Sequence, residues 1–106
     1  MFFDDIRIRI DKTGKGVIKI GNNCMIRELS WLAAFGGKIE IGDNTNLSYG
    51  VVIVARELVK IGNDVLIGEY TSIRDCDHKF NNANLLIRKQ GFEVKPVIIG
   101  NDVWIW

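Results

Sequence analysis

One short phrase occurs four times in this chain, and its spacing constrains the fold more than any other feature. Each copy is an isoleucine, a glycine and two Asn or Asp residues, at 20–23, 41–44, 61–64 and 99–102. From each of these anchoring isoleucines, an aliphatic residue recurs at every sixth position. The recurring residues are Ile26, Leu32, Leu47, Ile53, Ile67, Ile73 and Ile105. Repetition at this spacing indicates a fold built by stacking copies of one unit.

The six-residue period predicts short strands joined by corners. It differs from the 3.6-residue period of a helix, and it accommodates a strand with alternating sides plus a bend. Three such segments form a circuit of about 18 residues with a triangular section. The first three anchors are nearly evenly spaced, whereas the interval from Ile61 to Ile99 is much longer and holds one circuit and a long excursion. We place this excursion at about 79–98.

The positions four residues after the aliphatic residues are restricted to small or β-branched side chains, which suit a narrow interior. They hold Cys24, Ser30, Thr45, Val51, Val65, Thr71 and Val103. The glycine after each anchor suits a bend or a close approach of two backbones. The Asn and Asp residues that follow tolerate positive φ and are typical of corners.

This pattern resembles the hexapeptide-repeat family, whose members form left-handed parallel β-helices. The resemblance covers about residues 17–106 and implies an all-β solenoid with triangular circuits. The handedness follows from the resemblance alone, because most known parallel connections are right-handed. Before this domain, residues 1–16 are expected to form a lead-in strand and a turn, since isoleucines and arginines alternate at 6–10.

Charge and hydropathy argue against several classes of function. The chain has 14 Lys and Arg against 13 Asp and Glu, with the basic residues scattered, which does not favour a nucleic acid partner. Asp4 and Asp5 stand where a secretory signal has basic residues. No apolar run approaches the roughly 18 residues of a membrane span. We therefore expect a cytoplasmic protein with no membrane partner.

Two cysteines are too few to indicate a disulfide framework. Cys24 occupies one of the small-residue positions, so we expect it to be buried packing. Cys76 lies near the one histidine of the chain, where a thiol nucleophile is conceivable. No further base lies near it in the sequence to activate the thiol.

His78 stands where the regular repeat ends and the excursion begins. A rigid scaffold can hold a group at such a place while a loop shapes a pocket around it. An unperturbed imidazole titrates near about pH 6.5, so it can accept a proton from a hydroxyl at neutral pH. The alternative interpretation is a solvated corner, because Asp75 and Asp77 lie beside it.

The phrase Asp77-His78, a loop, and then Lys-Pro-Val-Ile-Ile-Gly-Asn-Asp-Val-Trp-Ile at 95–105 resembles the signature of sugar and xenobiotic O-acetyltransferases of the hexapeptide-repeat fold. The resemblance implies that His78 is the general base. It also implies direct transfer of acetyl from acetyl-CoA, as co-substrate, to a hydroxyl of a sugar or small-molecule acceptor, with no metal and no covalent enzyme intermediate. The sequence does not choose the acceptor.

Other candidate residues surround this histidine in the sequence. In an extended segment Asp75 and Asp77 point away from His78, so each is expected to be a solvated corner or to bind the acceptor. Asn84 is the preferred acceptor-binding residue of the excursion, because an apolar run that could anchor it follows directly. Trp104 matches the family's Val-Trp-Ile phrase and is a candidate for the coenzyme A site, with subunit packing as its alternative role.

Two hypotheses follow for the whole chain. One is an O-acetyltransferase acting as a homotrimer with sites between subunits, as the resemblance implies. The other is a truncated, non-catalytic solenoid that serves as an oligomerisation or binding module. It rests on Trp106, which stands where related enzymes have glycine and continue for about two more circuits. A γ-class carbonic anhydrase needs three histidines for zinc, and this chain has 1.

Overall fold

The computed structural model describes residues 2–3, 7–10 and 14–106, and short strands dominate it. Of the lead-in predicted for 1–16, residues 1, 4–6 and 11–13 therefore lie outside the described residues. A single 3-10 turn, η1 (Ile87–Lys89), is the only helical element among the described residues. The strands are β1 (Phe2–Phe3), β2 (Arg7–Ile10), β3 (Val17–Ile20), β4 (Met25–Ile26), β5 (Trp31–Ala34), β6 (Lys38–Ile41), β7 (Asn46–Leu47), β8 (Val52–Ala55), β9 (Leu58–Ile61), β10 (Leu66–Ile67), β11 (Ser72–Arg74), β12 (Cys76–His78), β13 (Phe92–Val94), β14 (Val97–Ile99) and β15 (Trp104–Ile105).

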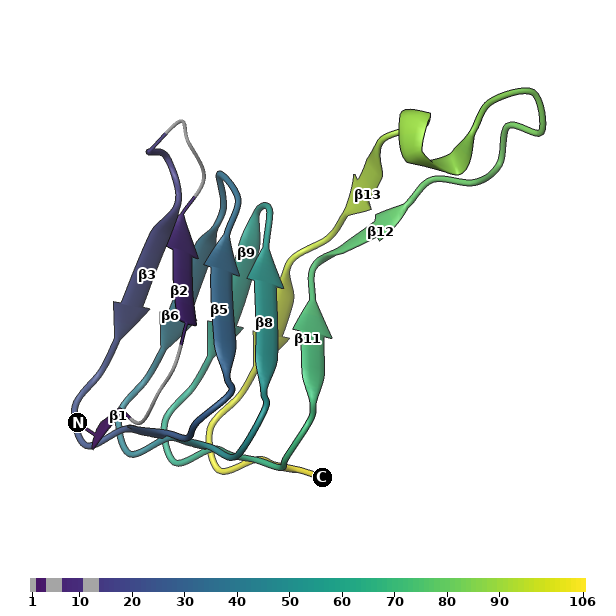
Figure 1. The fold of residues 1–106 in the computed structure, drawn as a ribbon. Coiled ribbons are helices and arrows are strands. Elements are labelled where there is room, and N and C mark those ends of the chain that lie inside the picture. Colours follow the sequence, from purple (N-terminus) through teal and green to yellow (C-terminus); the bar gives the residue numbers. More distant parts are fainter. Residues whose placement is uncertain (1, 4–6, 11–13) are drawn as a thin grey trace.

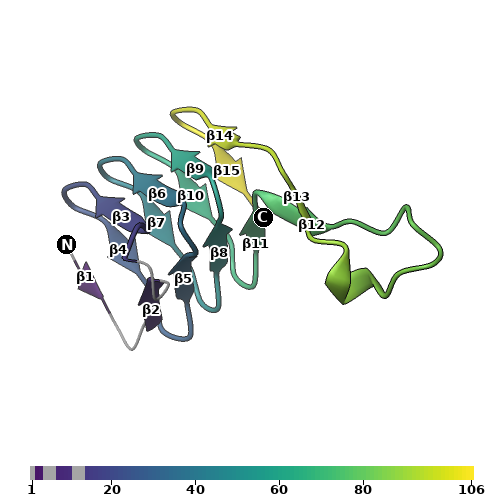
Figure 2. The same cartoon turned by 90° about the horizontal axis from the view of Figure 1, so that it is seen from above.

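Three parallel sheets enclose one core (Figures 1 and 2). The base sheet has the order β1-β4-β7-β10-β15, the front sheet β11-β8-β5-β2 and the rear sheet β14-β9-β6-β3. Apart from the antiparallel pair β12-β13, consecutive strands belong to different sheets, so the chain visits the three parallel sheets in turn, and we call one such passage a circuit. This arrangement confirms the predicted all-β parallel architecture and is compatible with a β-helix. No helix among the described residues is long and apolar enough to cross a membrane.

The pairing register places equivalent repeat positions side by side. Leu47 pairs with both Ile26 and Ile67, and Ile53 pairs with both Leu32 and Ile73. The side chains of these residues are at most 7% exposed and belong to one core cluster. The six-residue period is therefore the spacing of inward-facing side chains, and stacking removes them from water, which is the main favourable contribution to folding.

Five of the small-residue positions are buried, and the hydroxyl groups of Thr45 and Ser30 are satisfied between circuits. The Thr45 hydroxyl accepts a hydrogen bond from the Val65 N–H at 3.3 Å and donates one to the Gly62 carbonyl at 3.0 Å. Ser30 does the same with the Val51 N–H and the Ser48 carbonyl. Both residues are 0% exposed. Each hydroxyl thus has partners for its donor and acceptor functions, as a buried polar group requires.

The repeated Gly-Asx corners form a ladder along one edge. Asp43 Oδ1 accepts a hydrogen bond from the Asn22 N–H at 2.8 Å, and Asn63 Oδ1 accepts one from the Asp43 N–H at 2.7 Å. A Cβ on Gly42 would collide with Asn63 Oδ1 and with the backbone of Gly62. Close approach of successive corners, rather than an unusual φ, is therefore why glycine follows the anchor here.

Residues 76–94 leave the stacked circuits as an arm. The arm starts where the front and rear sheets meet, which is the corner opposite the base sheet (Figure 1). Its root is an antiparallel pair in which Cys76 opposes Val94 and His78 opposes Phe92. The chain then returns as β14, which pairs with β9 and resumes the rear sheet. The long excursion, predicted at about 79–98, is thus a projecting arm that departs and returns a few residues earlier, at 76–94.

Candidate functional site

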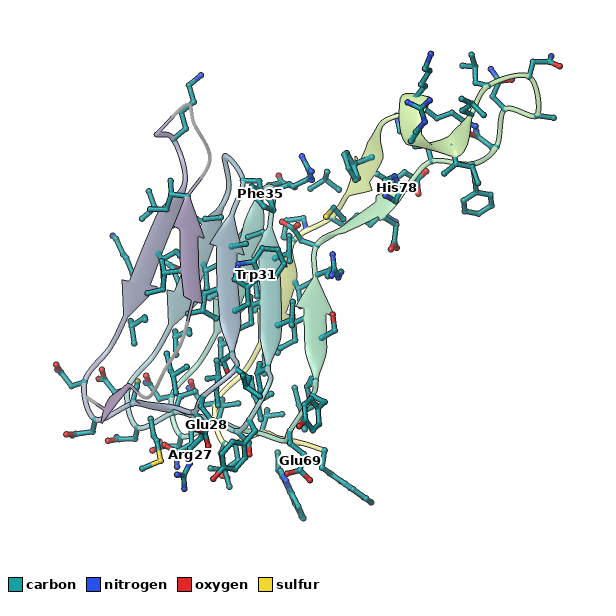
Figure 3. The ribbon with its side chains drawn as sticks, in the orientation of Figure 1. Arg27, Glu28, Trp31, Phe35, Glu69 and His78 are labelled. Atoms are coloured by element: carbon teal, nitrogen blue, oxygen red, sulfur yellow. The ribbon has the colours of Figure 1, made fainter. Side chains whose placement is uncertain are left out.

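His78 lies at the root of the arm and is accessible to solvent. It is the last residue of β12, and its ring packs against Phe92 of β13 with centroids 4.7 Å apart and planes tilted by 35°. The antiparallel pair and this ring contact hold the imidazole in place (Figure 3). Within the described chain, no carboxylate hydrogen-bonds to the imidazole. The arrangement leaves the ring nitrogens available to a substrate, as a general base requires.

A second cluster, called the outer cluster below, covers the outer face of the front sheet beside this histidine. Ala33, Val54 and Cys76 are its buried members, and Trp31, Phe35, Val52 and Phe92 pack around them. Trp31 and Phe35 meet edge to face with ring centroids 6.4 Å apart. The cluster joins the arm to the scaffold through Phe92, and the same ring supports His78.

Arg56 completes this region, although it belongs to no motif in the sequence. Its guanidinium carbon lies 3.8 Å from the centre of the Phe92 ring and 5.5 Å from that of Phe35. Phe35, Arg56 and Phe92 are distant in the sequence, so only the pairing of strands brings them together. A sequence signal was nevertheless present, because Phe35 and Arg56 are separated by the same interval as the anchors Ile20 and Ile41.

Asp75 is buried at 4% exposure, so its prediction as a solvated corner is wrong. Its Oδ1 accepts the Arg56 N–H at 2.8 Å, and its Oδ2 accepts the N–H groups of Glu57 and Leu58 at 2.7 and 2.8 Å. Its own carbonyl accepts the Lys95 N–H at 2.8 Å, which closes the base of the arm. The side chain and backbone of one residue therefore fix the point where the arm departs and returns.

The pairing of the earlier circuits explains this role. Val17 and Lys38 donate their N–H groups to the carbonyls of Gly37 and Glu57 in the following circuit. Leu58 occupies the equivalent position one circuit later, where the chain turns away into the arm. The Asp75 carboxylate takes the place of the missing carbonyl. Without it, three N–H groups at this partly buried corner would lose these partners, which lowers stability.

The remaining predicted residues of the arm are exposed. Asp77 opposes Glu93 across the antiparallel pair. Asn84 donates its backbone N–H to Asn82 Oδ1 at 2.9 Å, in a loop that is also tied by Gln90. From 77 to 89 every residue is exposed. Acceptor binding by Asp77 and Asn84 stays a prediction.

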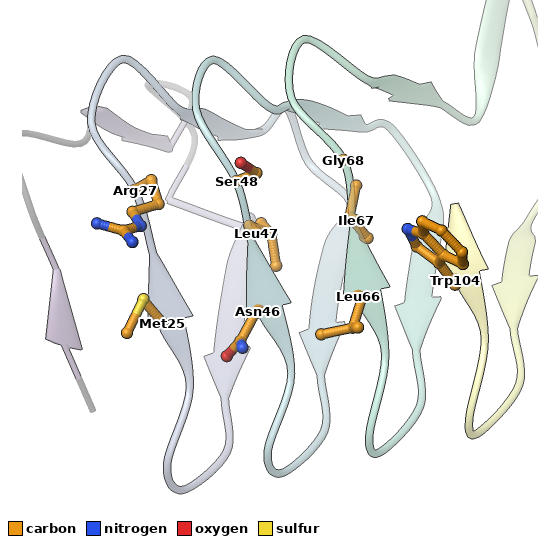
Figure 4. A pocket seen from close by; sticks show the side chains of 9 residues that line it. All are labelled: Met25, Arg27, Asn46, Leu47, Ser48, Leu66, Ile67, Gly68 and Trp104. Carbon is orange, nitrogen blue, oxygen red and sulfur yellow. The ribbon is translucent and has the colours of Figure 1, made fainter. Parts of the chain in front are cut away.

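Trp104 lies in a separate groove on the outer face of the base sheet (Figure 4). The groove has a volume of about 280 Å³ and combines apolar side chains with the polar groups of Arg27, Asn46 and Ser48. Trp104 is 67% exposed and stacks on Trp106 with ring centroids 5.7 Å apart. Apolar walls with a few polar groups are typical of a small-molecule site.

One copy of the chain does not bring this groove and His78 together. Arg27 lines the groove at the base sheet, whereas His78 lies on the arm beyond the opposite corner (Figure 3). The predicted base and the predicted coenzyme residue, Trp104, therefore occupy different sides of the molecule. Any reaction that uses both needs groups from two copies.

The two cysteines are both buried, and neither forms a disulfide. The Cys24 thiol donates a hydrogen bond to the Gly42 carbonyl at 3.0 Å inside the core, which confirms the predicted packing role. Cys76 is 9% exposed and packs in the outer cluster. Among the described residues, no group of three or more His, Cys, Asp and Glu side chains could hold a metal ion.

Comparison with known proteins finds a relative that is named as an acetyltransferase. The chain is 33% identical over 88 residues to a protein of Mycobacterium tuberculosis (strain ATCC 25618 / H37Rv) named "probable acetyltransferase". The aligned segment covers 83% of this chain and 29% of the relative, so this chain corresponds to under a third of that protein. No protein-family profile matches the chain, and no solved structure matches significantly. The similarity thus extends over most of this chain and relates it to an acetyltransferase by name.

Proposed function

We propose that this chain is an O-acetyltransferase of the hexapeptide-repeat type, folded as a left-handed parallel β-helix, that moves acetyl from acetyl-CoA to a hydroxyl of a sugar or small-molecule acceptor. The observation that carries the proposal is the exposed His78, fixed at the root of an arm in a chain similar to a named acetyltransferase over 83% of its length. The stacking of Ile26, Leu47 and Ile67 in successive circuits supports the β-helix.

In the proposed reaction, His78 removes the proton of the acceptor hydroxyl while that oxygen attacks the thioester carbonyl of acetyl-CoA. The C–O bond forms as the C–S bond breaks, and the thiolate leaves. The proton then passes from the imidazolium to the thiolate, which regenerates the neutral base. Alignment of the two substrates supplies a large part of the acceleration in reactions of this kind.

The proposed assembly is a homotrimer, in which the arm of one chain reaches the groove of the next. Two observations support it. The groove that holds Trp104 and the arm that holds His78 lie on different sides of a single copy. The arm also exposes Phe80, Leu86 and Ile87 by 75%, 57% and 54%, and apolar surface of this kind is typical of protein contacts. Trp104 is the proposed contact for coenzyme A, and Asp77 and Asn84 are proposed to bind the acceptor.

The test is release of free thiol from acetyl-CoA in the presence of a panel of hydroxyl acceptors. Replacing His78 by Ala should lower kcat by about 10²- to 10⁴-fold, the usual contribution of a general base. Replacing its exposed neighbour Lys79 by Ala is the matched control and should leave the rate within about twofold of the parent. Equal turnover by the parent and the His78→Ala variant would exclude His78 as the base.

A calorimetric titration with coenzyme A separates the two hypotheses for this chain. Binding in the micromolar range supports the acetyltransferase. A well-folded oligomer that does not bind coenzyme A would instead support a non-catalytic oligomerisation or binding module.

A further inference from the structure

The Arg56 side chain packs against two aromatic rings and uses none of its side-chain hydrogen-bond donors within the described chain. Its guanidinium contacts the faces of two aromatic rings, those of Phe92 at 3.8 Å and Phe35 at 5.5 Å. Its backbone N–H is fixed by both oxygens of Asp75, at 2.8 and 3.1 Å. Contacts of this kind use no N–H group in a hydrogen bond, so the guanidinium donors stay available to other partners.

No acceptor for those donors lies in the part of the chain that the structure describes. Among the described residues, the only ion pair joins Lys38 and Glu40. The Arg56 guanidinium makes neither an ion pair nor a hydrogen bond with them. The side chain is exposed, and its contacts with the two rings restrict its movement. A fixed guanidinium loses little conformational entropy when it binds a carboxylate or phosphate in a bidentate manner.

The position of Arg56 relative to His78 indicates which molecule it meets. The Phe92 ring that contacts the guanidinium also contacts the imidazole, whose centroid lies 4.7 Å from the ring centre. Both groups are solvent-exposed at the root of the arm. A small molecule whose hydroxyl reaches the imidazole can therefore place a second group near the guanidinium.

From this geometry we infer that Arg56 binds an oxyanion of the acceptor, so that the preferred acceptor is an acidic sugar or another hydroxyl compound with a carboxylate or phosphate. The inference rests on the proposed function, because it takes the bound molecule to be the acceptor of acetyl transfer. Binding of the oxyanion itself can be measured without turnover. Arg56 is then a specificity-determining residue, and Phe35, Phe92 and Asp75 are the residues that position it.

The test compares two sugars that differ in one group. Methyl β-D-glucuronide carries a carboxylate where methyl β-D-glucoside carries a neutral hydroxymethyl group. Titrations of each sugar into the full chain, followed by NMR chemical shifts, should show at least about tenfold tighter binding of the glucuronide, as expected for charge-assisted hydrogen bonds. The largest shifts should occur at the Arg56 Nε–H and at the His78 ring.

Two variants and a matched control locate the effect. Replacement of Arg56 by Gln should remove the preference for glucuronide, and replacement by Lys should retain only part of it, because the planar fork is lost while the charge remains. Arg74→Gln removes the same charge from β11, where Arg74 pairs with Val54, two residues before Arg56, and its Nε donates to Ser72 Oγ at 3.3 Å. This control should keep the full preference, and a loss equal to that of Arg56→Gln would overturn the inference.

Coenzyme A offers the same oxyanion chemistry, so a second arm of the experiment distinguishes the two sources. Arg56→Gln should leave the affinities for coenzyme A and dephospho-coenzyme A unchanged. A specific loss of affinity for coenzyme A, with sugar binding unaltered, would assign Arg56 to the cofactor and overturn the acceptor assignment. Equal affinity of the parent chain for the two sugars would also overturn the acceptor assignment.

The outcomes for this inference and for the proposed function are separable. Preferential glucuronide binding that depends on Arg56, without any acetyl transfer, would support the anion site and contradict the acetyltransferase. Transfer that depends on His78 but occurs equally well to neutral and acidic acceptors would support the enzyme and contradict the anion site.

Discussion

The stacked circuits and the arm are made of the same chain but are held together by different forces. In the circuits, residues such as Ile53 and Leu47 are 0% exposed and pair with equivalent residues above and below. In the arm, every residue from 77 to 89 is exposed, and the loop is tied by hydrogen bonds around Asn82 and Gln90. Apolar burial therefore stabilises the scaffold, whereas the region that carries His78 depends on polar contacts and on its attachment to the scaffold.

This difference explains why the candidate site lies where it does. Inside the stacked circuits each inward-facing position is covered by its equivalents in the neighbouring circuits, which leaves no room for a pocket in the interior. The arm departs from that regularity at Asp75 and presents side chains that no neighbouring circuit covers. The outer cluster then ties the arm to the front sheet through Phe92. Function on a segment attached to a rigid scaffold is a common arrangement in proteins.

The largest expected difference in stability is between truncating an isoleucine in the circuits and truncating one in the arm. Ile53→Ala should lower the free energy of unfolding by about 2–5 kcal/mol, because it leaves a cavity in the core. Ile87→Ala in the arm, where the side chain is 54% exposed, should change it by no more than about 0.5 kcal/mol. Urea unfolding followed by circular dichroism measures both.

Protein concentration sharpens this comparison. If the arm is covered in the proposed trimer, the cost of Ile87→Ala should grow at concentrations where the trimer forms. A cost equal to that of Ile53→Ala at concentrations where the chain is monomeric would break the distinction between scaffold and arm.

A smaller effect is expected at the junction between the two regions. Asp75→Asn keeps the size of the side chain but replaces one acceptor oxygen by an NH₂ group that faces N–H donors. The free energy of unfolding should fall by about 1–3 kcal/mol, the cost of leaving buried hydrogen-bonding groups without partners. Urea unfolding measures the fall, and Asp77→Asn, two residues further on and exposed, is the control with an expected change within about 0.5 kcal/mol. Equal effects of the two substitutions would show that Asp75 does not hold the junction.

The smallest effect concerns surface charge on the circuits. The hydrogen bond from Lys38 lowers the pKa of Glu40 below its usual value; burial opposes this, and the charges of Lys38, Lys60 and Lys19 lower the pKa further. Because the folded pKa lies below the unfolded one, the stabilisation is present above the unfolded pKa and is lost as pH falls through the folded pKa. The described arm contains no ion pair, so we expect no matching contribution from it.

NMR titration of the Glu40 carboxyl carbon measures this effect. Its midpoint should rise in Lys38→Gln and should rise less in Lys60→Gln, because the hydrogen bond from Lys38 is the largest cause. A midpoint that does not move in Lys38→Gln would show that the ion pair does not persist in solution.

Repetition made the scaffold predictable from the sequence. The sixth-position residues Ile26, Leu32 and Ile53 are all 0% exposed, and the corner residues Asn23 and Asp64 have φ of 56° and 58°. The same type of residue recurs at the same position in each circuit, and such a recurrence is not expected by chance. Cys24 was likewise placed correctly, because it occupies a repeat position.

The arm and its surroundings were less predictable because their contacts have no period. The sequence places Asp75 beside His78, which favours a polar corner, and only the departure of the chain shows which backbone donors its carboxylate must satisfy. The repeat interval relates Arg56 to Phe35, but nothing in the sequence relates it to Phe92, because the path of the arm decides that contact. The separation of Trp104 from His78 was also invisible, because the two residues lie on different faces of the circuits.

The sequence by itself determined the interior of this protein, because inward-facing positions must be aliphatic, small or β-branched wherever circuits stack. It also determined where the stack is interrupted, through the long interval between the last two anchors, Ile61 and Ile99. Only the tertiary structure decided what lies on the outside. Side chains on an outer face are limited by their neighbours in space, such as Phe92 beside Arg56 and His78, and those neighbours are set by the path of the arm.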